Sequence, residues 1–221
     1  MFVSPETERP GKQITLVLGG AQSGKSYYAQ QLASPFERVT FIATARRTDA
    51  EMRSKIARHR RARPVSWKTV EAPVDLDKAI RSQSQKADVL LIDCLTVYAD
   101  NIAGTEKKRK SHANDCIEAI CEAILASEAS VIVVSNEVGS GIVPEYRSGR
   151  LYRDFLGQMN QKIAQMADRV ILMVAGVPLA IKDSTTCNAD GDRSDVRPRA
   201  EATTSGNGVH KSHFRSQETL K

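Results

Sequence analysis

The fold is decided by residues 14–26, which read ITLVLGGAQSGKS: a short apolar run followed at once by a glycine-rich turn. The last eight of these residues fit the spacing G-x-x-x-x-G-K-S/T of a phosphate-binding loop. Glycines let successive main-chain N–H groups turn toward one phosphate, Lys25 adds a cation at the β- and γ-phosphates, and Ser26 offers a hydroxyl to Mg²⁺. An apolar strand before the loop and a helix after it argue against a chance turn. The residues predicted to hold the triphosphate are Gly19, Gly20, Ala21, Gln22, Ser23, Gly24, Lys25 and Ser26.

Apolar runs alternate with amphipathic stretches after this loop. Strands are predicted at 14–18, 39–43, 89–92, 131–135 and 169–174, with a short edge strand at 178–182. Helices are predicted over stretches that include 48–61, 75–83, 117–125 and 152–166. Most of the strands are apolar on both faces, which is typical of a parallel sheet buried between two layers of helices. We therefore predict an α/β fold with a mostly parallel sheet and helices on both faces.

Two acidic residues follow predicted strands. Asp93 comes directly after the run 89–92, and Glu137 comes shortly after 131–135. Ligands of such sheets bind at the carboxyl ends of the strands, where both residues are expected to lie. Beside a phosphate-binding loop, Asp93 is predicted to be a Mg²⁺ ligand together with Ser26. Glu137 is a candidate residue for the acceptor site or for the metal.

The formal charge of +6 is concentrated in one stretch of the chain. Residues 46–68 hold nine Lys and Arg against two acids, a local excess of +7 (9 − 2), which fits a polyanionic ligand such as nucleic acid or nucleotide phosphates. On the predicted helix His59 shares a stripe with Met52, Ile56 and Arg63, so it faces the protein while nearby arginines disfavour the imidazolium. A neutral imidazole is a usable nucleophile toward phosphorus, although a core histidine explains the same pattern equally well.

The chain length of 221 residues fits one domain with a sizeable core. Residues 14–182 are predicted to form this domain, 1–13 a flexible extension, and 183–221 a polar, disordered tail with too little apolar surface to fold. In the tail, His210 and His213 are interpreted as solvated side chains rather than metal ligands. The sequence has no apolar run long enough to span a membrane and no secretory signal. We therefore expect a cytoplasmic protein whose four cysteines stay reduced.

Taken in order, the motifs resemble those of the bifunctional adenosylcobinamide kinase / adenosylcobinamide-phosphate guanylyltransferase family of cobalamin biosynthesis. The resemblance covers roughly residues 14–182, nearly the whole predicted domain. The stretches that carry it are GGAQSGKS at 19–26, FIATA at 41–45, EM…IARH..ARP..W.T.E at 51–71, LLIDCLT at 90–96, VSNEVGSGIVPEYRSGRLYRDFLGQMNQ at 134–161 and VAGVPLAIK at 174–182.

The resemblance implies a RecA-like P-loop NTPase fold, a homotrimer and a small-molecule corrinoid substrate, with no nucleic acid. Members of the family phosphorylate adenosylcobinamide with ATP or GTP, and then transfer GMP from GTP to that phosphate to give adenosylcobinamide-GDP. The GMP travels on a histidine that matches His59, while Lys25 and the arginines neutralise charge as pyrophosphate departs. Further nucleotide contacts implied by the resemblance are Ala43, Thr44, Ala45, Arg60, Arg61, Ala62, Arg63, Glu71 and Asp93.

The chain departs from the family pattern in three places, one of which is the tail after Lys182, which has no counterpart in that pattern. Gln22 stands where many members carry Arg, which removes one phosphate-site cation, and the segment 101–111 is short and charged.

Two other classes of protein share the phosphate-binding loop. A nucleic-acid-stimulated ATPase would carry several aromatic residues among the basic residues of its patch. In this chain the only aromatic residue near the basic stretch is Trp67. A regulatory GTPase would normally show an Asn-Lys-x-Asp motif, which the sequence lacks.

Overall fold

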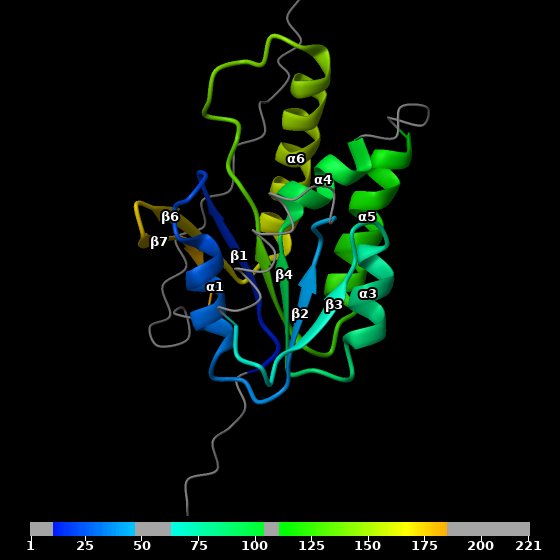
Figure 1. Ribbon diagram of the computed structural model, residues 1–221, viewed down its shortest axis with the longest axis vertical. Coiled ribbons are helices and arrows are strands. Elements are labelled where there is room, and N and C mark those ends of the chain that lie inside the picture. Colours follow the sequence, from blue (N-terminus) through cyan, green and yellow to red (C-terminus); the bar gives the residue numbers. More distant parts are fainter. Residues whose placement is uncertain (1–10, 47–62, 104–110, 185–221) are drawn as a thin grey trace, which may run out of the picture. The chain divides into compact units, whose positions relative to one another are not determined.

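The computed structural model describes residues 11–46, 63–103 and 111–184, and within these ranges the chain forms one seven-stranded sheet (Figure 1). The strand order is β3-β2-β4-β5-β1-β6-β7. Short apolar and β-branched runs form the central strands, as the sequence predicts. The strands are β1 (Ile14–Gly19), β2 (Val39–Ala43), β3 (Lys68–Glu71), β4 (Val89–Asp93), β5 (Ser130–Val134), β6 (Arg169–Val174) and β7 (Val177–Asp183).

Six of these strands run parallel to one another, and β7 alone runs antiparallel to them, paired with β6 at one edge. The sheet is therefore mostly parallel, with the phosphate-binding loop directly after its β1 strand. Since helices cover both faces, the predicted α/β fold with a mostly parallel sheet and helices on both faces is confirmed. The edge strand predicted at 178–182 is also confirmed, as β7.

Five helices of the described residues cover the two faces of the sheet. One of them, α1, packs against one face, whereas the other four pack against the opposite face (Figure 1). On α6 the buried residues Leu156, Met159 and Ile163 follow one another at spacings of three and four, which places them on the inner side of the helix. The helices are α1 (Lys25–Ala33), α3 (Leu76–Gln83), α4 (Leu95–Ala103), α5 (Ser111–Leu125) and α6 (Arg147–Met166).

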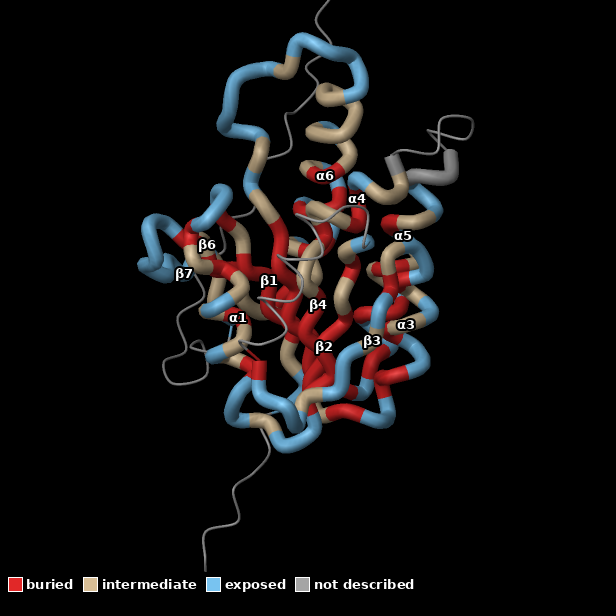
Figure 2. The backbone as a smooth tube through the Cα atoms, in the orientation of Figure 1, coloured by how far each residue is buried: buried red, intermediate tan, exposed pale blue. Residues whose placement is uncertain are grey.

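The strands divide their side chains between two apolar layers, and β4 shows how. Val89 and Leu91 belong to the layer under α1, while Leu90 and Ile92 belong to the layer under α3, α4, α5 and α6. All four side chains are fully buried, because neighbouring residues of a strand point to opposite faces and both faces are covered. Buried residues accordingly follow the middle of the sheet, and exposed residues lie on the outer helix surfaces and loops (Figure 2).

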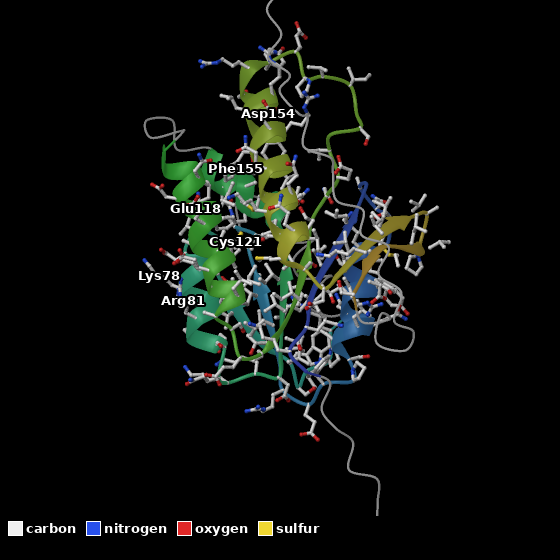
Figure 3. All side chains as sticks on the ribbon, turned by 180° about the vertical axis from the view of Figure 1, so that it is seen from behind. Lys78, Arg81, Glu118, Cys121, Asp154 and Phe155 are labelled. Carbon is white, nitrogen blue, oxygen red and sulfur yellow. The ribbon has the colours of Figure 1, made fainter. Side chains whose placement is uncertain are left out.

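The helices on the face opposite α1 have polar outer surfaces and apolar surfaces toward the sheet. Lys78 and Arg81 lie on the outer side of α3, with Lys78 paired to Asp75 at 2.8 Å and Arg81 to Glu122 of α5 at 3.5 Å (Figure 3). Cys121 of α5 and Phe155 of α6 pack against the core below them. This division is the expected pattern for helices that cover a sheet.

Two elements of the structure are missing from the sequence prediction. Strand β3 reads KTVE, and Val70 is its half-buried residue, so its apolar signal is too weak to mark a strand. Helix α4 begins two residues after β4 ends, with no polar loop to separate the two apolar stretches. Tertiary pairing and packing therefore decide both elements more than local sequence does.

Several predictions concern residues outside the described ranges. The helix predicted at 48–61, with His59, falls there, as do residues 1–10 and most of the tail predicted at 183–221, so these stay predictions. The domain limits 14 and 182 likewise stay predictions, although β1 begins at Ile14 and β7 ends at Asp183. The described cysteines Cys94, Cys116 and Cys121 are free thiols, half-buried rather than fully buried. Among the described helices, none combines the length and apolarity that a membrane span requires.

Candidate functional site

The turn between β1 and α1 brings the chain very close to the neighbouring strand β6. A Cβ atom on Gly19 would lie 2.5 Å from the carbonyl oxygen of Met173 and 2.7 Å from Ser23 Oγ, so a side chain does not fit there. Gly24, the residue that caps α1, has φ = +92°, in the left-handed region that favours glycine. The glycines at 19 and 24 are thus required by the geometry of the loop.

Lys25 lies inside the loop and is 7% exposed. Its Nζ atom donates to the carbonyl oxygen of Gly20 and, at 3.3 Å, to Ser23 Oγ. Burial lowers the pKa of the Lys25 ammonium, and the neighbouring Cys94 and Asp93 oppose that effect. A buried cation in a turn of main-chain N–H groups is suited to bind an anion, because phosphate oxygens would compensate its lost hydration.

The loop is tied to its surroundings by main-chain hydrogen bonds on both sides. The N–H of Gly176, in the turn between β6 and β7, donates to the carbonyl of Ser23 at 3.1 Å. The N–H of Glu137, just beyond β5, donates to the carbonyl of Gly19 at 3.0 Å. These contacts hold the loop in a fixed position at the carboxyl edge of the sheet.

The strand ends beside the loop form a row in strict register. Val17 pairs with Val134, Val134 with Asp93, Asp93 with Ala43, and Ala43 with Glu71. Since neighbouring strands lie about 4.8 Å apart, the row places β5, β4, β2 and β3 at roughly 5, 10, 14 and 19 Å from β1. The carboxylates predicted from the sequence therefore stand along one edge, with Asp93 near the phosphate loop and Glu71 far from it.

Thr44 fastens the end of β2 to the end of β4. Its side chain is fully buried, and its hydroxyl accepts from the N–H of Cys94 at 2.9 Å and donates to the carbonyl of Cys94 at 2.8 Å. The Thr44 N–H donates to the carbonyl of Asp93 at 3.4 Å. Asn101 of α4 donates its side-chain amide to the Thr44 carbonyl at 2.8 Å and to the Pro73 carbonyl at 2.9 Å. Thr44 therefore has a structural role besides its predicted place among the nucleotide contacts.

Of the predicted arginines, the structure describes Arg63. Its guanidinium lies 3.7 Å from the centre of the Phe41 ring and its Nη1 donates to Thr69 Oγ1 at 3.4 Å, with 9% of the residue exposed. Phe41 points to the face of the sheet that α1 covers, so Arg63 packs on that face beside β2 and β3. Outside the described residues lie four predicted site residues: His59, Arg60, Arg61 and Ala62.

A second polar network, which the sequence prediction missed, holds the segment after β5. The N–H of Asn136 donates to Thr96 Oγ1 at 2.8 Å, and the carbonyl of Asn136 accepts from Asn160 Nδ2 at 3.0 Å. Tyr152 donates its hydroxyl to the Thr96 carbonyl at 3.1 Å. One signal was available in the sequence, because Asn160 is a polar residue within the buried stripe of α6.

Ser26 and Asp93 were predicted to hold Mg²⁺, and their chemistry fits that ion. In nucleotide sites Mg²⁺ takes one or two protein oxygens and completes its shell with phosphates and waters. A hydroxyl directly after Lys25 and a carboxylate close enough to affect the pKa of Lys25 supply such a donor set. Both residues stay predicted ligands.

Two surface hollows among the described residues lie away from this edge. One hollow is lined by Gln13, Thr15 and Arg169 at the opposite end of the sheet, and another lies between α5 and α6 around Lys162. The phosphate-binding loop is recognised by its main-chain geometry.

Residues 15–181 match a family model described as cobinamide kinase / cobinamide phosphate guanyltransferase. The chain belongs to this family. Three similar proteins are described as bifunctional adenosylcobalamin biosynthesis proteins. CobP of Pseudomonas aeruginosa is 39% identical over 168 residues, which cover 76% of this chain and 96% of that protein. CobU of Escherichia coli and CobU of Salmonella typhimurium are 38% and 36% identical over 180 residues, 76% of this chain and 99% of each relative.

Among solved structures, a type III secretion ATPase is similar with a TM-score of 0.47 at 11% identity, covering 76% of this chain and 56% of that one. The RadB recombinase gives a TM-score of 0.40 at 14% identity, covering 72% and 73% of the two chains. The assignment to the cobinamide kinase / cobinamide phosphate guanyltransferase family rests on the sequence match. It confirms the resemblance found in the motifs, and with it the prediction that the chain is an enzyme with both activities of the family.

Proposed function

We propose that this enzyme phosphorylates adenosylcobinamide with ATP or GTP and then transfers GMP from GTP, by way of a guanylylated histidine, to adenosylcobinamide phosphate. The product is adenosylcobinamide-GDP, and pyrophosphate leaves. The observation that carries the proposal is the family match over residues 15–181, within which the phosphate-binding loop has its required glycines and its buried lysine.

In the first step, the loop binds the phosphates of the nucleotide. Main-chain N–H groups and Lys25 stabilise the charge that develops on the transferred phosphoryl group and on the leaving diphosphate. Ser26 and Asp93 would hold Mg²⁺, which would supply positive charge to offset that of the phosphates. Lys25 exchanges its bond to the Gly20 carbonyl for one to a phosphate oxygen, so the cation is already in place before the substrate arrives.

In the second step, His59 attacks the α-phosphorus of GTP through a neutral ring nitrogen. The new N–P bond replaces the bond to the β-phosphate oxygen, and pyrophosphate departs from the loop, where Lys25 compensates its charge. The phosphate of adenosylcobinamide phosphate then displaces the histidine. The row of strand ends from Val17 to Glu71 supports this arrangement, because it extends from the phosphate loop past Asp93 and Thr44 and can hold an extended nucleotide.

The histidine step is tested by incubation with GTP labelled at the α-phosphate. Acid-labile, alkali-stable label is expected on the wild-type protein and on His112→Ala, a matched histidine control in α5. His59→Ala is expected to carry no label while its kinase activity remains. Label that persists on His59→Ala would end the assignment of His59, and absence of label on every variant would contradict the covalent mechanism itself.

The remaining parts of the proposal concern assembly and surroundings. We propose a homotrimer in the cytoplasm, where ATP and GTP are available, with corrinoid and nucleotides as partners and without nucleic acid. Light scattering on the purified full chain is expected to give three times the chain mass of 24.3 kDa. A mass of one or two chains would contradict the trimer. It would not bear on the proposed reactions, which the activity assays test. Oligonucleotides are expected to leave ATP turnover unchanged.

A further inference from the structure

Glu137 is held beside the phosphate-binding loop by hydrogen bonds of its own main chain and of the preceding residue. Its N–H donates to the carbonyl of Gly19 at 3.0 Å. The preceding residue, Asn136, is held at its N–H by Thr96 and at its carbonyl by Asn160. The main chain at Glu137 is therefore anchored to β1, α4 and α6, which fixes the position from which its side chain extends.

Among the described residues, one oxygen of the Glu137 carboxylate accepts a hydrogen bond, and the other does not. Its Oε1 atom accepts from the N–H of Gly139 at 2.5 Å, and the residue is exposed. The structure gives Oε2 no partner among the described residues. One oxygen thus orients the group while the other faces solvent, as expected of a base that must reach a bound substrate.

The order of the strands separates Glu137 from the other carboxylates of this edge. Glu137 follows β5, the neighbour of β1, so it starts about 5 Å from the phosphate-loop strand, while Asp93 on β4 starts about 10 Å away and Glu71 on β3 about 19 Å away. Asp93 is the predicted Mg²⁺ ligand, and Glu71 is too distant to reach a γ-phosphate held by the loop. Of the carboxylates at the ends of described strands, Glu137 therefore lies best placed for a group next to that phosphate.

We infer that Glu137 is the general base of the kinase step, an inference that rests on the function proposed above. The acceptor is a hydroxyl group of adenosylcobinamide, which must lose a proton as its oxygen attacks phosphorus. The hydroxyl oxygen forms a bond to the γ-phosphorus, and the bond from that phosphorus to the β-phosphate oxygen breaks. The nucleoside diphosphate leaves with that electron pair, and the hydroxyl proton moves to Glu137 Oε2. The guanylyl transfer needs no such base, because its acceptor is a phosphate that is already ionised at neutral pH.

Glu137→Gln separates this role from a structural one. The amide oxygen of glutamine can still accept the N–H of Gly139, so the orientation of the segment is retained, but an amide does not take up the proton. The matched control is Glu128→Gln, at the opposite end of the same strand, where Glu128 accepts from Gln85 at 2.8 Å. Each variant is assayed for phosphorylation of adenosylcobinamide and, separately, for guanylyl transfer to supplied adenosylcobinamide phosphate.

For Glu137→Gln, we expect the kcat of the kinase step to fall by about 10²- to 10⁴-fold, the usual contribution of a general base. Guanylyl transfer should stay within about threefold of wild type, and Glu128→Gln should keep both rates. A kinase kcat within threefold of wild type overturns the inference, and so does an equal loss in both reactions. If the wild-type protein phosphorylates no adenosylcobinamide, the proposed function fails instead, which is a different result.

A second variant makes the test independent of the hydrogen bond to Gly139. Glu137→Ala removes the carboxylate entirely, and added formate then supplies a small carboxylate that can occupy the vacated place. Kinase activity of Glu137→Ala is expected to rise with formate concentration, while that of wild type does not. Absence of any increase, together with normal nucleotide binding by the variant, would also overturn the role of Glu137 as base.

Discussion

The side-chain amide of Asn101 donates to the main-chain carbonyl of Thr44 at 2.8 Å, and its second hydrogen is donated to the carbonyl of Pro73 at 2.9 Å. Thr44 comes directly after β2 and Pro73 two residues after β3. One side chain of α4 thus joins the chain on either side of residues 45–72, the stretch that holds the whole basic patch of residues 46–68. The positions of Thr44 and Glu71 depend on this contact from a helix that carries no predicted site residue.

Replacing Asn101 by Ala is expected to lower the free energy of unfolding by about 2 kcal/mol, since each lost hydrogen bond contributes about 1 kcal/mol and the Thr44 carbonyl stays buried. Urea denaturation measures the loss. Asn114→Ala, an exposed asparagine in α5, is the control and should change stability by no more than about 0.5 kcal/mol. Equal stabilities of the two variants would show that the Asn101 contacts do not hold the strand ends.

Much of the sheet follows from local sequence. The strands β1, β2, β4, β5 and β6 are apolar runs that both layers of helices bury, so hydrophobic pattern alone marks them. The strand β3 lies at an edge with little burial, and its place is set by pairing with β2. Its sequence could not mark it, because an edge strand needs apolar residues on one face at most.

The site divides in the same way. The loop from Gly19 to Ser26 is predictable because a local spacing determines its geometry. The contacts of Asn101, Thr96 and Asn160 join residues at least 24 positions apart in the chain, so they arise from tertiary packing that one sequence does not reveal. The prediction missed these contacts because the residues that make them are far apart in the chain, and not because their chemistry is unusual.

The two glycines at the start of the loop are predicted to differ in their tolerance of a side chain. Gly19→Ala should lower the free energy of unfolding by about 2 kcal/mol, because its Cβ meets the rigid main chain at Met173 and overpacking costs about 1–3 kcal/mol. Gly20→Ala should change it by about 0.5 kcal/mol or less, since no atom lies within 4 Å of the added Cβ. Thermal unfolding compares the variants, and a larger loss for Gly20→Ala would contradict the structure of the loop.

Lys25 is predicted to bind the nucleotide phosphates without adding to the free energy of unfolding of the nucleotide-free protein. Burial lowers its pKa, so charging it costs free energy in the folded protein without nucleotide, and stability should rise with pH from that lowered pKa up to 10.5, where the unfolded chain still holds the extra proton. Lys25→Met should therefore be at least as stable as wild type at pH 7 without nucleotide.

GTP is the second measurement on this variant. At a concentration 100 times Kd, GTP should stabilise wild type by about 2.7 kcal/mol and Lys25→Met far less. Lys86→Met, an exposed lysine at the amino edge of the sheet, should keep the full effect. A Lys25→Met protein that GTP stabilises as much as wild type would remove Lys25 from the phosphate site.

Tyr152 is predicted to make the protein sensitive to alkali. Burial raises the pKa of its hydroxyl from 10.0 to about 12, while the unfolded chain ionises near 10. Between these values the unfolded chain has lost a proton that the folded protein keeps, so the free energy of unfolding should fall as pH rises, by at most about 1.4 kcal/mol per pH unit for this group. Tyr152→Phe removes the hydroxyl that donates to Thr96, which should cost about 1 kcal/mol at pH 7, but it should weaken the decline above pH 10. Urea denaturation at several pH values tests both effects. The same decline in Tyr152→Phe as in wild type would mean that another group causes the alkaline loss.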